Sequence, residues 1–322
     1  MPLLVVGSVA LDSVHTPHDV REDVLGGSAV YFSYAASFFT SIRLVGVVGE
    51  DWPEEHTQFL RARRIDTRGL RIVPGGKTFR WRGRYETNMN DRETLEVHLN
   101  VLGDFDPVLP DDFQRCPYVF LANGSPRAQL KVLDQMTGPR LVVADTMDLW
   151  IRNNHDELMQ LFRRVEGLVL NDSEAKLLTG DENLVRAGHR IRELGPKFVV
   201  IKKGEHGAMF FSQHETYVLP AYPTQLVIDP TGAGRVLGRG RCGGLRRGRF
   251  RGGGGGWNLG LRRPDQQHFA AAVEMRQRPR RHLGEILAGV EGDIGDLGDR
   301  IAGRPNAFRR AGRICCSSPS RP

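Results

Sequence analysis

Short apolar runs alternate with helical stretches along most of the chain before residue 202. The runs lie at residues 3–7, 44–48, 118–121, 141–144, 167–170 and 198–201, and helical spacing occurs at 28–39, 54–64, 129–136, 149–164 and 184–194. A continuous apolar run of this length is typical of a strand buried on both faces, and strands linked by helices form parallel sheets. The pattern therefore predicts an α/β fold, with a mostly parallel sheet flanked by helices.

One segment between these runs follows a different period. Residues 79–85 and 94–99 alternate apolar and polar side chains, and residues 88–91 between them are turn-like. Such alternation is the signature of half-exposed antiparallel strands. We expect a small antiparallel β lid that spans roughly residues 75–102. The pattern leaves open whether Trp81 and Tyr85 pack the lid or touch a substrate. A further hairpin is predicted from residues 207–211 and 215–219.

The composition changes abruptly after Gly234. Residues 1–234 hold 26 Lys and Arg against 31 Asp and Glu, whereas residues 235–322 hold 19 against 7, and all 19 of those bases are Arg. Five consecutive glycines stand at 252–256, and prolines and arginines interrupt the apolar periods of this segment. We expect one α/β domain at residues 1–234, followed by an Arg/Gly-rich tail at 235–322 that is disordered or poorly folded.

Nothing in the sequence predicts a membrane-inserted or secreted protein. No stretch approaches the roughly 20 apolar residues that span a bilayer. The first residues carry no Lys or Arg, and Asp12 comes too early for a signal peptide. The cysteines lack the spacing of a metal site or a disulfide framework; they are Cys116, Cys242, Cys315 and Cys316. We therefore expect a cytoplasmic protein.

The most specific motif is the hexapeptide Asp-Pro-Thr-Gly-Ala-Gly that follows the apolar residues 226–228. Its members are Asp229, Pro230, Thr231, Gly232, Ala233 and Gly234. Two glycines around an alanine let the backbone turn with its N–H groups exposed, and such a nest at a helix start binds phosphate oxygens. The motif predicts a phosphoryl-transfer site, with Gly232 to Gly234 as the anion nest. A plain glycine turn after a strand is the alternative.

With this motif, the chain resembles a ribokinase-like (PfkB-type) carbohydrate kinase over residues 1–234, whereas the last 88 residues do not match. That family ends its motif with an Asp after Gly-Ala-Gly. Further segments that are similar to the family follow in the family's order. They are Gly-Ser-Val-Ala-Leu-Asp at 7–12, Gly-Gly-Ser-Ala at 26–29, Gly-Val-Val-Gly-Glu-Asp at 46–51, the lid, Asn-Asp-Ser-Glu at 171–174 and Lys-Gly-Glu-His-Gly at 203–207.

The resemblance implies ATP-dependent phosphorylation of a hydroxyl of a sugar or nucleoside, with Mg²⁺ as the second cofactor. It places the acceptor at Asp12, Gly26, Gly27 and Ser28, and the ATP phosphates at Asn171, Glu174, Lys203, Gly204, Gly207, Asp229 and Thr231. Glu174 would act on the metal indirectly. It also implies a homodimer through the lid. Asn171 and Glu174 equally fit a helix capping box, and His206 fits a surface residue.

Two further acceptor contacts are predicted from position alone. Asn123 and Asp145 follow buried strands at their carboxyl ends, where ligands of open α/β sheets bind.

The base of the reaction is missing from its expected place. Phosphoryl transfer to a hydroxyl uses a carboxylate to accept the proton, and the family's Asp position is occupied here by Arg235. A guanidinium stays protonated and cannot serve as a base. We therefore expect this chain to be inactive. The alternatives are a non-catalytic sugar- or nucleoside-binding pseudokinase, or, through the Arg-Gly segment at 247–252, an RNA-binding protein.

A reading-frame shift explains the break at Gly234. The residues from Arg235 to Gly240 allow the codons CGN GTN CTN GGN CGN GGN, and reading one nucleotide later permits Ser-Leu-Ala-Gly-Gly after the first codon. The resembled family typically continues with Asp-Ser-Phe-Ala-Gly-Gly. Text rich in Arg and Gly but without Lys is also what shifted GC-rich DNA produces. We interpret residues 235–322 as the product of such a shift, with a genuine basic tail as the alternative.

Overall fold

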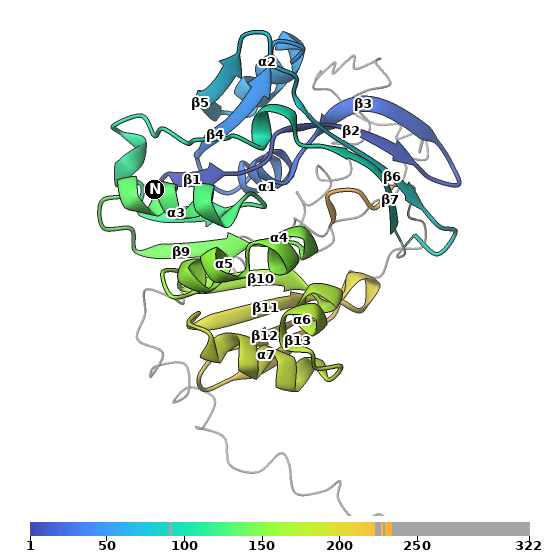
Figure 1. The fold of residues 1–322 in the computed structure, drawn as a ribbon, viewed down its shortest axis with the longest axis vertical. Helices are drawn as coiled ribbons and strands as arrows, with labels where there is room; N and C mark the ends of the chain where they lie inside the picture. Colours follow the sequence, from blue (N-terminus) through green and yellow to red (C-terminus); the bar gives the residue numbers. More distant parts are fainter. Residues whose placement is uncertain (90–91, 223–226, 228, 234–322) are drawn as a thin grey trace, which may run out of the picture. The chain divides into compact units, whose positions relative to one another are not determined.

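The computed structural model describes residues 1–89, 92–222, 227 and 229–233. Its main sheet has nine strands in the order β13-β12-β11-β10-β9-β8-β1-β4-β5 (Figure 1). The strands are β1 (Leu3–Val6), β4 (Ile42–Gly49), β5 (Ile65–Val73), β8 (Tyr118–Leu121), β9 (Leu141–Asp145), β10 (Gly167–Asn171), β11 (Phe198–Lys202), β12 (Ala208–Phe211) and β13 (Thr216–Leu219). The strands from β5 to β11 pair in parallel, which confirms the predicted fold class. The predicted hairpin is β12 and β13, which pair antiparallel.

The chain reverses its direction across the sheet at β1. From β1 it proceeds to β4 and β5 on one side, and it returns through β8 to β11 on the other. Because all these strands are parallel, their carboxyl ends lie along one edge of the sheet. The gap between β1 and β8 is therefore the topological switch point, where open α/β sheets bind their ligands.

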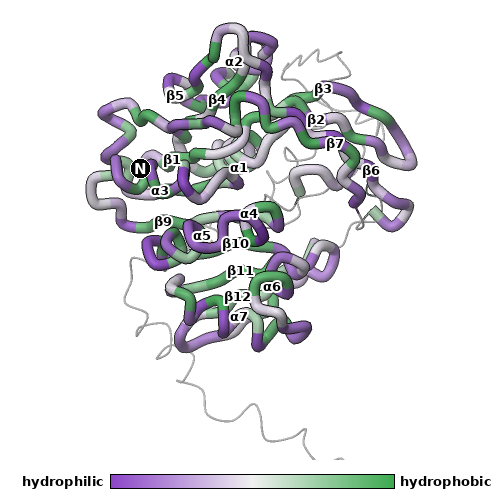
Figure 2. Tube along the Cα trace, in the orientation of Figure 1, coloured by the Kyte–Doolittle hydropathy of each residue, from purple (hydrophilic) through white to green (hydrophobic). Residues whose placement is uncertain are grey.

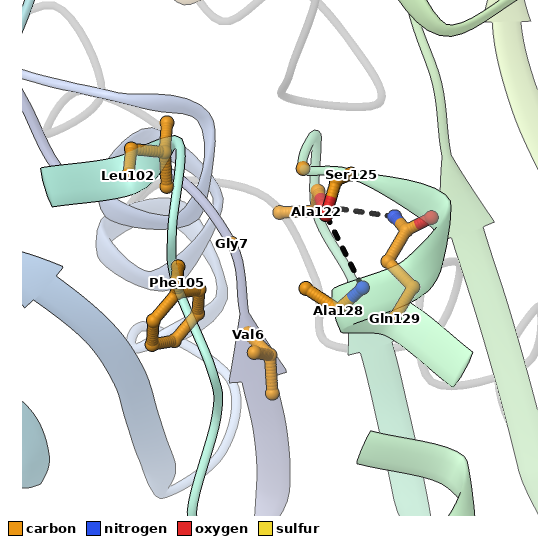
Figure 3. Close-up of a pocket in the computed structure, with 9 residues that line it drawn as sticks. Val6, Gly7, Leu102, Phe105, Ala122, Ser125, Ala128 and Gln129 are labelled. Atoms are coloured by element: carbon orange, nitrogen blue, oxygen red, sulfur yellow. Dashed lines mark hydrogen bonds between the residues drawn. The ribbon is translucent and has the colours of Figure 1, made fainter. Parts of the chain in front are cut away.

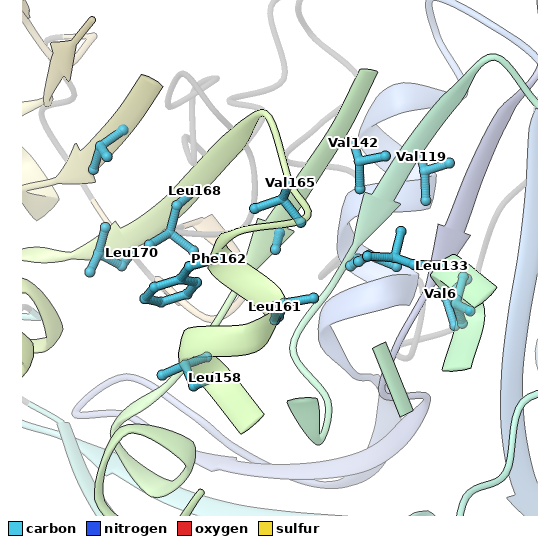
Figure 4. Close-up of a cluster of buried hydrophobic side chains, with 14 of the residues drawn as sticks. Val6, Val119, Leu133, Val142, Leu158, Leu161, Phe162, Val165, Leu168 and Leu170 are labelled. Atoms are coloured by element: carbon cyan, nitrogen blue, oxygen red, sulfur yellow. The ribbon is translucent and has the colours of Figure 1, made fainter. Parts of the chain in front are cut away.

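Two hydrophobic clusters lie on opposite faces of the main sheet. Leu4 and Val6 of β1 belong to the larger cluster, and Val5 between them belongs to the smaller one, as alternation along a strand requires. The larger cluster is packed by α3 (Pro126–Gln135), α4 (Asp148–Asn153), α5 (His155–Phe162), α6 (Asp172–Thr179) and α7 (Leu184–Glu193). Figure 4 shows α5 inserting Leu158, Leu161 and Phe162 among the strand residues. The smaller cluster is packed by α1 (Ser28–Ala36) and α2 (Glu54–Ala62).

The face of β9 to β13 that lies opposite α5 and α7 is also apolar. Val169 and Val200 are buried there but belong to neither cluster. Phe198, Phe210 and Tyr217 stack in a row across β11, β12 and β13, with centroid distances of 5.6 and 5.5 Å. Figure 2 shows the hydrophobic residues along β11 and β12. Parallel sheets have both faces covered by other elements. The apolar residues of this face fit such packing.

The predicted lid is a sheet of four strands in the order β3-β2-β6-β7. They are β2 (Ala10–His15), β3 (Val20–Gly26), β6 (Phe79–Tyr85) and β7 (Arg92–His98). The hairpin of β6 and β7 is antiparallel as predicted. β2 and β3 form a second antiparallel hairpin, and β2 pairs with β6 in parallel. The sequence did not predict β2 and β3. β2 is buried along almost its whole length, and the polar residues of β3 stand together at positions 21–23, so neither strand shows alternation.

The lid is anchored to the main sheet at Asp51, the last residue of the predicted Gly-x-Asp segment. Its Oδ1 accepts hydrogen bonds from the backbone N and the hydroxyl of Thr78, both at 2.7 Å, and its Oδ2 pairs with Arg80 at 2.9 Å. Burial raises the pKa of Asp51, but the bonds from Thr78 and Arg80 outweigh burial and lower it. Asp51 is therefore an ionised carboxylate that binds the start of β6.

One predicted helix is divided. The sequence predicts a single helix at 149–164, but α4 ends at Asn153 and α5 begins at His155. Asn154 between them has φ −132° and ψ 41°, outside the helical region, and its side-chain amide donates to Glu157. Asparagine favours helix starts over helix interiors because its side chain competes for backbone partners. Three short 3₁₀ turns complete the described elements: η1 (Asn100–Leu102), η2 (Phe113–Arg115) and η3 (Gly204–His206). Within the described ranges, no helix has the length and apolar character to cross a bilayer.

The stability of the α6–α7 region is expected to depend on Asp181 at acidic pH. A bidentate pair of hydrogen bonds from Arg186, both 2.9 Å long, holds the pKa of Asp181 at about 2, below its usual 3.8. A carboxyl whose pKa is lower in the folded state stabilises the fold above its unfolded pKa, and this contribution disappears as the pH falls through the folded value. Asp181→Asn should therefore lower the melting temperature at pH 6, and the difference from the unaltered chain should shrink between about pH 4 and pH 2.

Thermal melts at successive pH values would measure this difference. Asp134→Asn provides the control, because Asp134 forms an exposed ion pair with Arg164. A difference that stays constant from pH 6 to the acid end would rule out the proposed protonation of Asp181.

Candidate active site

The Asp12 carboxylate lies at the centre of the predicted acceptor site. It projects from β2, and the residue is only 5% exposed. Its Oδ2 accepts hydrogen bonds from the backbone N of Gly27 at 3.4 Å and from the hydroxyl of Tyr31 at 3.2 Å. A Cβ atom at Gly26 would lie 2.2 Å from Asp12 Cγ. The structure thus brings Asp12 together with the predicted double glycine, and glycine is needed there because the carboxylate occupies the space of a side chain.

Ser28 joins this carboxylate to the switch point of the main sheet. Its backbone N donates to Ser8 Oγ at 3.0 Å, and its hydroxyl donates to the carbonyl of Asn123 at 3.3 Å. The backbone N of Ser8 donates to the same carbonyl at 3.0 Å. Ser8 follows β1, Ser28 begins α1, and Asn123 follows β8. The predicted acceptor residues Ser28 and Asn123 therefore lie together at the carboxyl ends of β1 and β8.

Asn123 is also held by its side chain. The indole Nε1 of Trp150 donates to its Oδ1 at 2.9 Å, and its Nδ2 lies 3.0 Å from the sulfur of Met147. Met147 directly precedes α4, and Trp150 lies within it. Trp150 and Tyr31 could not be predicted from the sequence, because their partners, Asn123 and Asp12, lie 27 and 19 residues away and no local pattern links them.

The described part of the Gly-Ala-Gly loop packs against Tyr31 and Tyr85. A Cβ at Gly232, whose φ is +78°, would lie 2.6 Å from the ring of Tyr31. The side chain of Thr231 lies beside the Tyr85 hydroxyl, although Thr231 Oγ1 forms no hydrogen bond of normal geometry with the described residues. Burial raises the pKa of Tyr31 well above its usual value, and the nearby charges of Asp12 and then Asp229 raise it further. The predicted loop and the acceptor carboxylate are therefore neighbours.

Two N–H groups of this loop are engaged within it. Thr231 N donates to Asp229 Oδ1 at 2.8 Å, and Ala233 N donates to the carbonyl of Pro230 at 3.0 Å. Gly234 and Arg235 lie outside the described residues, so the position of the base and the end of the nest stay predictions.

Two aromatic residues of the lid differ in their surroundings: Tyr85 lies beside Thr231, whereas Trp81 packs within the lid. Tyr85 is 8% exposed and packs with Val14 and Met89 beside Thr231. The ring of Trp81 covers Gly83, where a Cβ would lie 2.1 Å from it, and Arg92 lies over its face at 5.5 Å. Trp81 thus packs the lid.

A buried ion pair lies at the carboxyl ends of β9 and β11. Lys202 Nζ lies 3.3 Å from Asp145 Oδ1, and the two side chains are 14% and 1% exposed. Asn171, at the end of β10 between them, is in register with Lys202. The lysine predicted from the sequence, Lys203, instead precedes η3 and donates its backbone N to the carbonyl of Gly207 at 2.7 Å. Strand alternation from Val200 would have indicated Lys202 as the residue on the face of Asp145.

Asn171 and Glu174 form the capping box that the sequence left open. Asn171 Oδ1 accepts from the backbone N of Glu174 at 2.7 Å, and Glu174 Oε2 accepts from the backbone N of Asn171 at 2.6 Å. The cap begins α6 at the carboxyl end of β10. It fixes the Glu174 carboxylate, which is 7% exposed, at the same edge as Lys202.

Gly204 and Gly207 shape the turn from β11 to β12. Their φ values are +55° and +84°, and a Cβ at Gly207 would lie 1.9 Å from the carbonyl of Leu219. His206 between them is 72% exposed in its side chain, which confirms that it is a surface residue.

A small pocket lies at the carboxyl ends of β1 and β8 on the α3 side (Figure 3). Its polar residues already serve the fold. Ser125 Oγ accepts from Ala128 N at 3.2 Å at the start of α3, and Gln129 Nε2 donates to the carbonyls of Leu121, Ala122 and Asp145. Its other lining is apolar, so we assign no ligand to it.

Comparisons with known proteins identify the family of this chain. Residues 4–234 match the family described as pfkB family carbohydrate kinase. A cytidine kinase of Thermococcus kodakarensis is 29% identical over 255 residues, which is 77% of this chain and 90% of that protein.

Solved structures resemble the fold. A putative ribokinase II of E. coli, in complex with ATP and Mg²⁺, has a TM-score of 0.61 at 20% identity, over 72% of this chain and 82% of its own. A nucleoside kinase of Methanocaldococcus jannaschii has a TM-score of 0.58 at 18% identity, over 73% and 81%. The chain therefore belongs to the pfkB family of carbohydrate kinases, whose members are ATP-dependent phosphotransferases.

Proposed function

We propose that this chain carries the acceptor site of an ATP-dependent kinase that phosphorylates a hydroxyl of a sugar or nucleoside. The observation that supports it most is the Asp12 carboxylate, which is only 5% exposed, packs against Gly26 and accepts a hydrogen bond from the backbone N of Gly27. A fixed carboxylate in a buried site recognises a hydroxyl by accepting a strong, charge-assisted hydrogen bond from it. The cytidine kinase among the relatives supports a nucleoside as one class of acceptor.

The residues present fit ATP and Mg²⁺. Lys202 and the capped Glu174 lie at one sheet edge, with the Gly232 loop beside the acceptor carboxylate. The described residues hold no group of three or more His, Cys, Asp or Glu that could bind a metal alone. Mg²⁺ keeps several of its waters and binds through one or two carboxylates and substrate phosphates, so a single carboxylate such as Glu174 can serve it. When bound with ATP, Mg²⁺ neutralises phosphate charge. We assign Glu174 to the metal, indirectly, and Lys202 with the predicted Lys203 turn to the phosphates.

We further propose that this chain binds its acceptor but does not turn over, because Arg235 occupies the position of the base. Calorimetry and an ADP-release assay separate the two properties. Binding of a sugar or nucleoside without ADP release is the expected result, and measurable ADP release would refute the inactivity. A homodimer through the lid is proposed as well; Val20 and Val97 are exposed on the lid at 56% and 44%.

Asp12→Asn tests the acceptor site directly. The amide keeps the shape of the carboxylate but removes its charge, and hydrogen bonds to charged groups contribute about 1.5–3 kcal/mol. The dissociation constant for the acceptor, measured by calorimetry on a panel with cytidine, adenosine, ribose and fructose, should rise by about tenfold to a hundredfold.

Asp19→Asn in the exposed turn between β2 and β3 is the matched control and should leave the affinity unchanged. If the unaltered chain binds a panel compound and Asp12→Asn binds it equally well, Asp12 is not the acceptor carboxylate.

A further inference from the structure

The orientation of the Asn123 amide is fixed by Trp150. The indole Nε1 lies 2.9 Å from the amide oxygen of Asn123. An indole N–H can only donate, so the atom that faces it has to be the oxygen. The NH₂ group of Asn123 must therefore point the other way, and the usual ambiguity between the two ends of an amide does not arise.

The backbone of Asn123 is held just as firmly. Its carbonyl accepts from Ser8 N at 3.0 Å and from the Ser28 hydroxyl at 3.3 Å. Ser28 follows the double glycine that packs on Asp12. The Asn123 backbone is thus linked through Ser28 to the glycine that bonds the Asp12 carboxylate, at the switch point of the sheet.

The NH₂ group that results has a weak partner. Among the described residues it meets Met147 Sδ at 3.0 Å. A thioether is a weak hydrogen-bond acceptor, so an oxygen of a ligand would form a stronger bond with this group. Asn123 is half-buried, which leaves it reachable at the carboxyl edge of β8.

We propose that Trp150 is a positioning residue that presents the Asn123 NH₂ group as a hydrogen-bond donor to the acceptor substrate. The site then selects a ligand that offers an oxygen acceptor at this point, either a base carbonyl of a nucleoside or an oxygen of the sugar. This inference rests on the proposed acceptor site and adds two residues to it: Trp150, which does not touch the ligand, and Met147, which the ligand oxygen displaces.

The test compares variants of the full chain by calorimetry with cytidine and with ribose as probes. Asn123→Asp replaces the NH₂ group by an oxygen, and Trp150 still has an oxygen to bond. Loss of the donor should weaken cytidine binding by about tenfold to a hundredfold. Trp150→Phe keeps an aromatic ring but removes the N–H, so the Asn123 amide can rotate by 180°. This variant should bind cytidine about threefold to tenfold more weakly.

The decisive measurement is the double variant. If Trp150 acts through Asn123, the Asn123→Asp and Trp150→Phe double variant should bind no more weakly than Asn123→Asp alone, because the donor is already absent. If Trp150 only supports the fold, the two losses should add. Trp52→Phe is the matched control, since it removes an indole N–H that bonds Thr57 at 3.0 Å away from this site, and it should leave both affinities unchanged.

Each outcome bears on a different claim. A loss for cytidine with ribose unaffected places the selected oxygen on the base, whereas equal losses place it on the sugar. Unchanged affinity in Asn123→Asp, or additive losses in the double variant, overturns the inference while the acceptor site stands. If the unaltered chain binds neither probe, the acceptor site itself fails and the inference fails with it.

Discussion

A version of this chain with the shifted reading frame restored after Gly234, and with Arg235→Asp, is expected to release ADP at least a hundredfold faster than the chain as it stands. A positioned general base contributes about 10²–10⁴-fold to proton transfer, and a guanidinium at that position cannot contribute it. The family match ends at residue 234. The restored segment would supply the residues that the family has after this point. The assay is ADP release over the sugar and nucleoside panel.

Two controls separate the base from the rest of the segment. Arg235→Asn in the restored version keeps every other residue and should lower the rate by about a hundredfold or more. Arg235→Asp in the present chain supplies the carboxylate alone and should stay slow if the segment after it is foreign. ADP release by the unaltered chain at the rate of the restored one would show that position 235 is not the base and that no frame needs restoring.

Gly27→Ala is expected to lower the free energy of unfolding by about 3 kcal/mol or more and to abolish acceptor binding. Gly27 has φ +98° and ψ 144°, a region that is essentially open to glycine alone. A Cβ there would lie 2.4 Å from the carbonyl oxygen of Ser8 and 2.8 Å from the backbone N of Ala10, and backbone atoms cannot step aside as a side chain can. The substitution would push α1 away from the strand that carries Asp12.

Gly138→Ala is the matched control for the backbone cost. Gly138 has φ +58°, but a Cβ there meets nothing within 4 Å. The left-handed conformation alone costs about 1–2 kcal/mol. Urea unfolding of both variants should therefore show a clearly larger loss for Gly27→Ala, and equal losses would mean that the close contacts with Ser8 and Ala10 relax at little cost.

The sequence predicts the parallel sheet well because its signal is local. Each of the strands β8 to β11 is a short apolar run that needs no partner to be seen, and burial on both faces removes the polar alternation. The hairpin of β12 and β13 and that of β6 and β7 could also be predicted, because each joins two strands that are adjacent along the chain. β2 and β3 were missed because their place in the lid follows from pairing β2 with β6, about seventy residues later along the chain.

The site shows the same division between local and distant information. Asp12 and the double glycine were found by motif, and the structure places them in contact. Tyr31, Trp150 and Lys202 were not, since each matters only through a partner far along the chain: Asp12, Asn123 and Asp145 respectively. The Asn171 and Glu174 spacing fitted both a cap and a metal role, and geometry shows the cap.

The proposed acceptor site takes its two halves from different sheets. Asp12 belongs to β2 of the lid sheet, whereas Asn123 follows β8 of the main sheet. A ligand that bonds to both has a binding free energy that depends on how far apart the two sheets stand. Any change that favours the sheet separation of the bound state therefore raises the affinity for the ligand. By thermodynamic linkage, ligand binding favours that sheet separation by the same factor. Occupancy of the proposed site and the separation of the two sheets are then coupled by a single free energy.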